Sequence, residues 1–264
     1  MDLGLSEKRV LVTGSTAGIG LATAELLARE GAQVIINGRS EERVNGAIRS
    51  ISKSVPGARV RGVAADLSNA AGCSHLIEVE PDVDVLINNM GIFEPKPFEQ
   101  ISDQEWLRFF EANVLSGIRL SRHYVGGMRT RNWGRIVFVS SESGLQIPTE
   151  MIHYGMTKTA QLAVARGLAE TLAGTGVTVN SVLPGPTGSE GVGTFVAQLA
   201  ADRGVDVSVV EREFFATARP SSIIRRFATP EEVASMIAYV CSAAASATTG
   251  ASLRVDGGVV RSIA

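Results

Sequence analysis

Residue types that mark several common kinds of site are scarce in this chain of 264 residues. The two cysteines, Cys73 and Cys241, lie in apolar stretches, and the three histidines show no spacing typical of metal ligands. We therefore expect no bound metal. Unpaired thiols in apolar stretches are also typical of proteins in a reducing compartment.

An excess of one charge and long apolar runs are missing as well. The 25 basic and 27 acidic residues are spread along the chain, which argues against a nucleic-acid or membrane-surface partner. No run approaches the roughly 20 apolar residues that span a bilayer, and the N-terminus has no signal-peptide pattern. We expect a cytoplasmic protein that binds a small molecule and further copies of itself.

No linker or low-complexity stretch divides the sequence. A length of 264 residues would allow two domains. However, 45% of the residues are hydrophobic and the composition does not change along the chain, which favours one large core. We therefore predict a single domain over residues 1–264.

Short runs rich in β-branched residues alternate with helical patterns along the chain. This alternation predicts an α/β fold, a doubly wound, Rossmann-type parallel sheet with helices on both faces. Ligands of such sheets lie at the carboxyl ends of the strands. The seven predicted strands are Arg9–Thr13, Val34–Asn37, Val60–Ala64, Val83–Ile87, Arg135–Ser140, Thr178–Leu183 and Ser252–Val255.

The connection between Pro184 and Pro230 is long for a compact domain. Glycines near its start are followed by apolar and aromatic residues such as Phe214 and Phe215. We predict that segment 184–229 is a mobile lid that covers the substrate.

The first predicted strand runs directly into a glycine-rich loop and then a helix. Glycines permit a tight turn, and a helix N-terminus offers free N–H groups to a pyrophosphate. This context predicts a dinucleotide site, and an ordinary strand-to-helix turn is the alternative. The residues expected at the cofactor here are Gly14, Ser15, Thr16, Gly18, Ile19 and Gly20.

The end of the second predicted strand indicates which dinucleotide binds. A protein that prefers NAD usually has an acidic residue there, whereas this chain has Arg39 followed by Ser40. Arg39 is able to pair with a 2′-phosphate, assisted by the hydroxyls of Ser15, Thr16 and Ser40. NADP(H) is therefore favoured, with NAD left possible and a solvated surface arginine as the alternative.

Further cofactor candidates follow the third and fourth strands. Asp66 and Leu67 come after the third strand, and Asn89 and Gly91 after the fourth, where adenine and ribose would lie. Asp66 is able to accept from the adenine amino group, and Gly91 lets the backbone pass close to the cofactor. Ordinary turn capping is the alternative reading of these residues.

Ser141, Tyr154 and Lys158 form a candidate catalytic group after the fifth strand. Tyr154 and Lys158 are four residues apart and therefore share one helix face. A cation about 4 Å from a phenol, at an effective dielectric of about 20, stabilises the anion by on the order of 4 kcal/mol. That is enough to bring the pKa of a phenol from about 10 toward neutrality. Alone, such a pair is equally typical of a solvated helix surface.

Through these residues and further motifs, nearly the whole sequence resembles the short-chain dehydrogenase/reductase family. The glycine motif of that family matches Gly14, Gly18 and Gly20, and its Tyr-x-x-x-Lys motif matches Tyr154 and Lys158. Further matches are Asn88-Asn89-Met90-Gly91 (methionine where alanine is typical), Asn113, Ser141 (Ser140 is the neighbouring alternative), Pro184-Gly185-Pro186-Thr187 and Asp256-Gly257-Gly258.

The resemblance implies a role for each matched residue. Ser141 binds the substrate oxygen, Tyr154 gives or takes its proton, and Lys158 lowers the proton affinity of the phenol and holds the nicotinamide ribose. Asn113 is implied to anchor a water that continues the proton relay. By the same resemblance Pro184, Gly185 and Thr187 lie beside the nicotinamide, and the protein is a homotetramer or dimer.

These residues predict an NADP(H)-dependent oxidoreductase that transfers a hydride between nicotinamide and the carbonyl or alcohol group of a small molecule. The resemblance leaves open a 3-oxoacyl reductase or a sugar or polyol dehydrogenase. The alternatives are an NAD-preferring dehydrogenase, a non-catalytic dinucleotide sensor, and a related isomerase or lyase. The complete Asn, Ser, Tyr and Lys set argues against the sensor, because binding alone does not require all four.

The identity of the substrate is not predicted by these motifs. Two acidic residues near the catalytic group disfavour a strongly anionic substrate, unless Arg219, Arg225 or Arg226 is brought inward. The residues expected to line the substrate pocket, together with segment 186–227, are Phe93, Glu142, Gln146, Ile147, Glu150, Met151 and His153.

Overall fold

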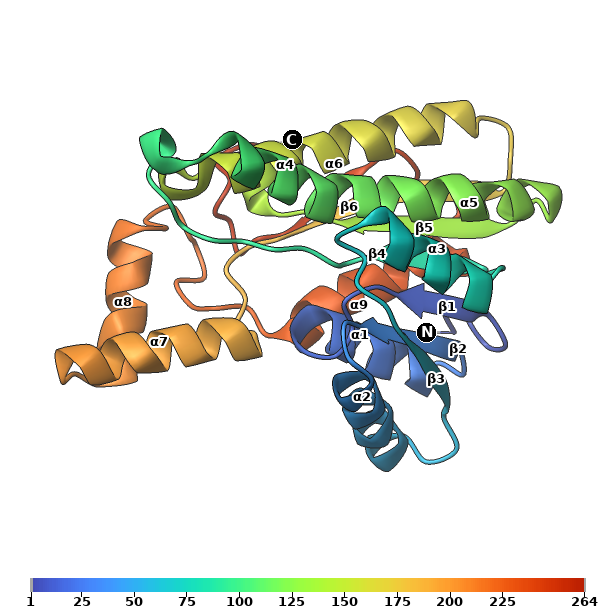
Figure 1. Cartoon of the computed structure of the whole chain (residues 1–264), viewed down its shortest axis with the longest axis horizontal. Coiled ribbons are helices and arrows are strands. Elements are labelled where there is room, and N and C mark those ends of the chain that lie inside the picture. The colour runs from blue at the N-terminus through green and yellow to red at the C-terminus, as the bar shows by residue number, and fades with distance from the viewer. Residues whose placement is uncertain (1, 264) are drawn as a thin grey trace.

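The computed structural model describes residues 2–263. Within them, seven strands form one sheet in the order β3-β2-β1-β4-β5-β6-β7 (Figure 1). All of the strand pairs are parallel. The strands are β1 (Arg9–Val12), β2 (Gln33–Gly38), β3 (Arg59–Ala64), β4 (Val85–Asn88), β5 (Gly134–Val139), β6 (Val177–Pro184) and β7 (Ser252–Val255).

Helices cover both faces of this sheet (Figure 1). One apolar cluster joins the sheet to α1 (Gly18–Arg29), α2 (Glu41–Ser54) and α9 (Pro230–Cys241). A second cluster joins the opposite face to α3 (Ala70–Val79), α5 (Ser116–Thr130) and α6 (Ile152–Thr171). The short helix α4 (Asp103–Phe110) precedes α5 and begins with a capping box between Ser102 and Glu105.

The predicted α/β fold is confirmed, and each predicted strand overlaps an observed one. β4, β5 and β6 are buried along their whole length, as strands covered on both faces must be. β4 begins at Val85, two residues later than predicted, and the carboxylate of Asp84 just before it accepts a hydrogen bond from the backbone N–H of Arg9 at 2.9 Å. Strand order reverses between β1 and β4, so a ligand site is expected at the carboxyl ends of these strands.

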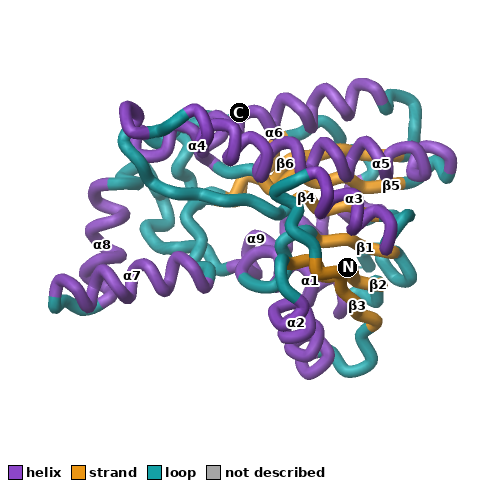
Figure 2. The backbone as a smooth tube through the Cα atoms, viewed as in Figure 1, coloured by secondary structure: helices purple, strands orange, loops and turns teal. Residues whose placement is uncertain are grey.

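Segment 184–229 contains two helices, α7 (Glu190–Arg203) and α8 (Val207–Thr217), which lie to one side of the sheet in Figure 1. They pack on each other through a small apolar cluster of their own that contains Val196, Ala200 and Val210. Figure 2 shows loops gathered between this helix pair and the sheet. The pair is therefore joined to the body of the protein mainly by loop residues.

Candidate active site

A cleft of about 1710 Å³ opens at the carboxyl edge of the sheet, beneath α7 and α8. This volume accommodates a dinucleotide together with a small molecule. Most of the predicted site residues line it: Thr16, Gly18, Ile19, Gly20, Arg39, Asn89, Gly91, Ser141, Tyr154, Lys158, Pro184, Gly185 and Thr187. Gly14, Ser15, Asp66, Leu67 and Asn113 lie behind this lining.

The glycine-rich loop packs tightly against the end of β4. Gly14 has a φ of 59°, and a Cβ added to it would lie 3.0 Å from the Cα of Met90. The side-chain amide of Asn89 donates to the carbonyl oxygens of Thr13 and Gly14 at 2.9 and 3.0 Å. α1 then begins after Ala17, which makes no side-chain cap. The first N–H groups of α1 are thus left for a ligand in the cleft.

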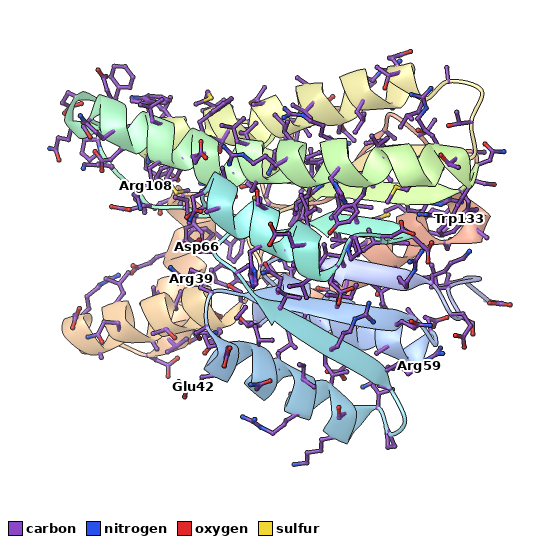
Figure 3. The ribbon with its side chains drawn as sticks, turned by 45° about the vertical axis from the view of Figure 1, so that its right-hand side comes forward. Arg39, Glu42, Arg59, Asp66, Arg108 and Trp133 are labelled. Carbon is purple, nitrogen blue, oxygen red and sulfur yellow. The ribbon has the colours of Figure 1, made fainter. Side chains whose placement is uncertain are left out.

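Two arginines lie at the rim of the cleft near the ends of β2 and β3. Arg39 follows β2 and is exposed, and Figure 3 shows it at the same edge of the sheet as Asp66. Arg43, one turn into α2, also lines the cleft and forms an ion pair with Glu190 of α7 at 3.1 Å. The sequence interpretation missed Arg43. Its place in the first turn of the helix that follows Arg39 is the signal that would have found it.

Ser15 does not have the predicted side-chain role. Its hydroxyl donates to the carbonyl oxygen of Val12 at 2.6 Å and accepts from the N–H of Asn37 at 3.0 Å. These bonds tie the loop to β1 and β2 inside the protein, so the hydroxyl is not directed at a phosphate. Thr16 and Ser40 do line the cleft.

Asp66 and Leu67 lie outside the lining of the cleft. The Asp66 carboxylate accepts from the backbone N–H of Ser68 at 3.1 Å, which is an ordinary turn contact. Leu67 is part of the core on the α3 side of the sheet. Both residues therefore shape the loop after β3 and do not enter the lining of the cleft.

The residues Pro184, Gly185 and Thr187 form one wall of the cleft at the end of β6. The Thr187 hydroxyl donates to the carbonyl oxygen of Gly185 at 2.9 Å. A Cβ added to Gly185 would lie 2.6 Å from the carbonyl oxygen of Asp256, so this turn packs against the chain that follows β7. Ser189 begins α7 directly after this wall.

Ser140 and Ser141 both follow β5, but their hydroxyls have different partners. The Ser140 hydroxyl donates to the backbone of Lys158 at 2.9 Å and so anchors α6. The Ser141 hydroxyl donates to the Glu142 carboxylate at 2.5 Å and accepts from the N–H of Ser143 at 3.1 Å. Ser141 is also hydrogen-bonded to Tyr154. This contact favours Ser141 over Ser140 as the serine paired with the tyrosine.

Tyr154 and Lys158 lie on one face of α6, yet their electrostatics differ from the prediction. Burial raises the pKa of Tyr154 above its usual value, and the neighbouring Ser141 hydroxyl only partly offsets this. The Lys158 ammonium lies 5.6 Å from the centre of the Tyr154 ring and donates to the carbonyl oxygen of Val139 at 2.9 Å. The predicted lowering of the phenol pKa is therefore wrong for this arrangement, because burial outweighs the distant cation.

Lys158 is itself perturbed by its surroundings. Burial lowers the pKa of the Lys158 ammonium to about 8. The ammonium thus loses its proton more readily than that of an ordinary lysine.

Asn113 occupies a turn of π-helix, Glu111–Leu115, between α4 and α5. Its side-chain oxygen accepts from the N–H of Ile92 at 2.7 Å, and its amide donates to the carbonyl of Ile92 and the hydroxyl of Thr157 at 3.0 Å each. π-helical turns are rare and often accompany functional sites. Here the turn ties the loop after β4 to α6.

Gln161 is a buried residue that the sequence interpretation did not consider. Its amide donates to the backbone carbonyl of Asn113 at 2.6 Å, and its oxygen accepts from the Lys158 ammonium at 3.3 Å. The Gln161 side chain thus links the Asn113 carbonyl to the Lys158 ammonium. The Asn113 carbonyl is hydrogen-bonded to Gln161 here.

Glu142 and Arg219 form a buried ion pair beside the catalytic serine. Arg219 follows α8, and its Nε lies 3.1 Å from Glu142, while its Nη1 lies 3.0 Å from Glu150. The Glu142 and Arg219 side chains are only 6% and 10% exposed. Segment 184–229 is therefore fastened to the catalytic loop by a charge pair.

Other predicted pocket residues divide into two groups. Phe93, Glu150 and Met151 line the cleft, and of the three arginines predicted for the substrate pocket Arg219 reaches it. Arg226 instead pairs with Glu232 outside it. Gln146, Ile147, His153 and Arg225 were also candidates and do not line it.

His153 is next to Tyr154 in the sequence and was therefore predicted to line the pocket, but its side chain has other neighbours. Its ring lies 4.0 Å from the ring of Phe109 and 5.9 Å from that of Trp106. One residue on a helix corresponds to a rotation of about 100°. His153 therefore points into the α4–α6 contact while Tyr154 points into the cleft.

Metal-binding groups and membrane-spanning helices are two further features of the described residues. Among residues 2–263, no group of three or more His, Cys, Asp or Glu side chains is arranged to hold a metal. None of the helices there is both long and apolar enough to cross a membrane.

Known proteins resemble this chain along its full length. Residues 14–260 match the model of a family described as enoyl-(acyl carrier protein) reductase. The chain is 47% identical over 263 residues to the uncharacterized oxidoreductase YvaG of Bacillus subtilis strain 168, covering 100% of both proteins. It is 32% identical to the 3-oxoacyl-[acyl-carrier-protein] reductase FabG of Aquifex aeolicus strain VF5, covering 98% and 100%.

A solved structure has the same fold throughout. L-sorbose reductase from Gluconobacter frateurii, complexed with NADPH and L-sorbose, superposes with a TM-score of 0.94 at 31% identity and covers 100% of both chains. The chain therefore belongs to the short-chain dehydrogenase/reductase family of oxidoreductases, which act on carbonyl and alcohol groups.

Proposed function

We propose that this protein is an NADP(H)-dependent carbonyl reductase or alcohol dehydrogenase for a small molecule. The observation that carries the proposal is the meeting of Ser141, Tyr154 and Lys158 on the wall of a cleft whose other end is the glycine-rich loop. The NADPH bound by the sorbose reductase supports the choice of cofactor.

The residues of the cleft fit a dinucleotide with a 2′-phosphate. The uncapped N-terminus of α1 offers N–H groups to a pyrophosphate. Arg39 and Arg43 supply positive charge where an NAD-preferring protein would have an acid. Pro184, Gly185 and Thr187 would hold the nicotinamide end.

The mechanism uses the protonated form of the tyrosine. When bound, the reduced cofactor supplies a hydride to the carbonyl carbon. Ser141 and Tyr154 hold the carbonyl oxygen, and Tyr154 donates its proton to that oxygen as it gains charge. Lys158 then stabilises the phenolate, and Gln161 holds Lys158 in position. The raised pKa of Tyr154 suits this acid role, because the phenol is fully protonated at neutral pH.

The pH profile of carbonyl reduction should follow Lys158. Because its pKa is lowered to about 8, the side chain is cationic below that pH and neutral above it. We expect kcat/KM for reduction to be level at acidic and neutral pH and to fall above about pH 8. Steady-state rates on both sides of that value test this, with Lys158→Met expected to be slow and to lack the inflection. A wild-type profile that stays level through pH 9, about one unit higher, would contradict it.

We also propose that segment 184–229 is a lid. Its helices have their own small core, and ion pairs from Glu190 and Arg219 connect it to α2 and the catalytic loop. Backbone amides of α7 and α8 should therefore gain at least about tenfold protection from hydrogen exchange when NADPH and substrate bind. Amides of α3, which packs on the sheet through the second apolar cluster, serve as the internal control. Equal exchange in α7 and α8 with and without ligands would contradict the proposal.

A homotetrameric or dimeric assembly in the cytoplasm completes the proposal. Phe98 and Leu107, next to and within α4, are 59% and 68% exposed, which is typical of apolar side chains covered in an oligomer. Cys73 and Cys241 are both buried and free, in keeping with a reducing compartment.

An assay of NADPH oxidation with a panel of 3-oxoacyl thioesters, ketoses and simple ketones tests the proposed activity. Oxidation that requires both the protein and a carbonyl compound supports it. NADPH binding without oxidation by any member of the panel would instead favour a dinucleotide sensor.

A further inference from the structure

Glu142 has an unusual position for an acidic side chain. It follows the catalytic serine in a 3-10 turn, Glu142–Gly144, and the residue is 5% exposed. One carboxylate oxygen accepts from Nε of Arg219 at 3.1 Å, and the other accepts from the hydroxyl of Ser141 at 2.5 Å. A buried carboxylate of this kind depends on its donors for stability.

The hydroxyl of Ser141 has a single proton, and the proposed chemistry uses that proton elsewhere. When Ser141 donates to the reacting carbonyl, it no longer donates to Glu142. The second carboxylate oxygen of Glu142 then lacks a donor in a buried site. Such a loss disfavours a complex by roughly tenfold to a hundredfold, unless the incoming molecule provides a replacement.

Two nitrogens of the neighbouring cation, Arg219, have other partners. Arg219 holds the first oxygen of Glu142 through Nε, while its Nη1 donates to Glu150 at 3.0 Å and to the carbonyl of Ala218 at 2.8 Å. Two carboxylates thus share one guanidinium, so this part of the cleft has a net negative charge. It favours substrates with hydroxyl groups over anionic ones.

The distance between Ser141 and Glu142 suggests where the substrate hydroxyl lies. The two side-chain oxygens are 2.5 Å apart, so groups that bind to them must be close neighbours in the substrate. A carbonyl oxygen and a hydroxyl on the adjacent carbon have a similar separation, about that of two hydrogen-bonded oxygens.

We propose that Glu142 accepts a hydrogen bond from a hydroxyl on the carbon next to the reacting carbonyl. The preferred substrates are then α-hydroxy ketones and aldehydes, with vicinal diols in the oxidative direction. This inference rests on the proposed function, because it assigns Ser141 to the carbonyl oxygen. It goes beyond that function by assigning Glu142 to substrate selection.

Three small ketones and NADPH provide the test on the purified full-length protein. Hydroxyacetone has the required hydroxyl, 2-butanone replaces it with a methyl group, and methoxyacetone keeps the oxygen but has no proton to donate. Wild-type kcat/KM should favour hydroxyacetone over both others by at least about tenfold, because a site built for a hydroxyl rejects an analogue that lacks it.

Two variants of Glu142 separate recognition from folding. Glu142→Leu removes the acceptor and should make the three ketones nearly equal. Glu142→Gln keeps the volume: with its oxygen on Arg219, its amide donates to the substrate, so methoxyacetone should become as good as hydroxyacetone. Glu94→Gln is the matched control, because Glu94 pairs with Arg108 outside the lining of the cleft, and it should leave the ratios unchanged.

The outcomes distinguish this inference from the proposed function. If the wild type reduces hydroxyacetone and methoxyacetone equally well, or if Glu142→Gln keeps the wild-type preference, the role of Glu142 is overturned while carbonyl reduction stands. If no carbonyl compound is reduced, both fall. Loss of activity in Glu142→Leu by unfolding leaves the wild-type ratios and Glu142→Gln to decide.

Discussion

Replacing Tyr154 by Phe is expected to lower kcat for carbonyl reduction by about 1000-fold, a size typical of removing a general acid. The cleft would lose a proton donor but keep an aromatic ring of the same shape, packed edge-on against Phe93 at 6.4 Å between ring centres. The dissociation constant of NADPH should therefore change by less than about threefold. Rates of NADPH oxidation and a fluorescence titration of NADPH measure the two quantities.

A matched control for this substitution is Tyr239→Phe. Tyr239 lies in α9 and is 38% exposed, so the same chemical change is made away from the cleft. Its kcat should equal that of the wild type. Turnover in Tyr154→Phe comparable with the wild type would reject Tyr154 as the acid, and weak NADPH binding would point to a structural role instead.

Replacing Arg39 by Ala should change which cofactor is used. A guanidinium paired with a 2′-phosphate contributes a charge-assisted hydrogen bond, whose loss weakens binding by roughly tenfold to a hundredfold. NADH has no such phosphate, so its binding should change by less than about threefold. Dissociation constants of both cofactors for the wild type and Arg39→Ala measure the difference.

The same experiment tests the contribution of Arg43. Arg43 is paired with Glu190, so we expect a smaller effect from Arg43→Ala and the largest effect from the double variant. Arg49→Ala is the control for net charge, because Arg49 is exposed on the same helix and lies outside the lining of the cleft. If NADPH and NADH are weakened equally by Arg39→Ala, the role in recognising the phosphate is wrong.

The sheet and the positions of its strands were predictable because they depend on local patterns. Continuous apolar runs rich in β-branched residues, such as 136–139, have few alternatives to a buried parallel strand. The glycine-rich turn was predictable for a similar reason, since the positive φ of Gly14 and its close contact with Met90 require a residue without a side chain.

The parts of the site that depend on tertiary contacts were harder to predict. Glu142 and Arg219 are 77 residues apart, and their pairing requires α7 and α8 to fold back over the cleft. Gln161 looks like an ordinary polar residue of a helix until α6 is placed against the π-helical turn that contains Asn113.

The orientation of individual side chains was also difficult to predict from the sequence. Ser15 belongs to the predicted loop, but its hydroxyl turns inward to β1 and β2. Lys158 is spaced correctly for Tyr154, yet its ammonium is directed to Val139. Spacing along the chain predicts which residues share a region, whereas the direction of each side chain depends on the neighbours available for hydrogen bonding.

The central claim is that this cleft transfers a hydride from NADPH to a carbonyl carbon with Tyr154 as the proton donor. Mass spectrometry of the alcohol formed from hydroxyacetone and NADPH carrying deuterium at the transferred position tests it most directly. The account predicts that the product of the wild type carries the deuterium on the former carbonyl carbon, and that Tyr154→Phe forms almost none of this product. Product without deuterium, or equal amounts of labelled product from both proteins, would contradict it.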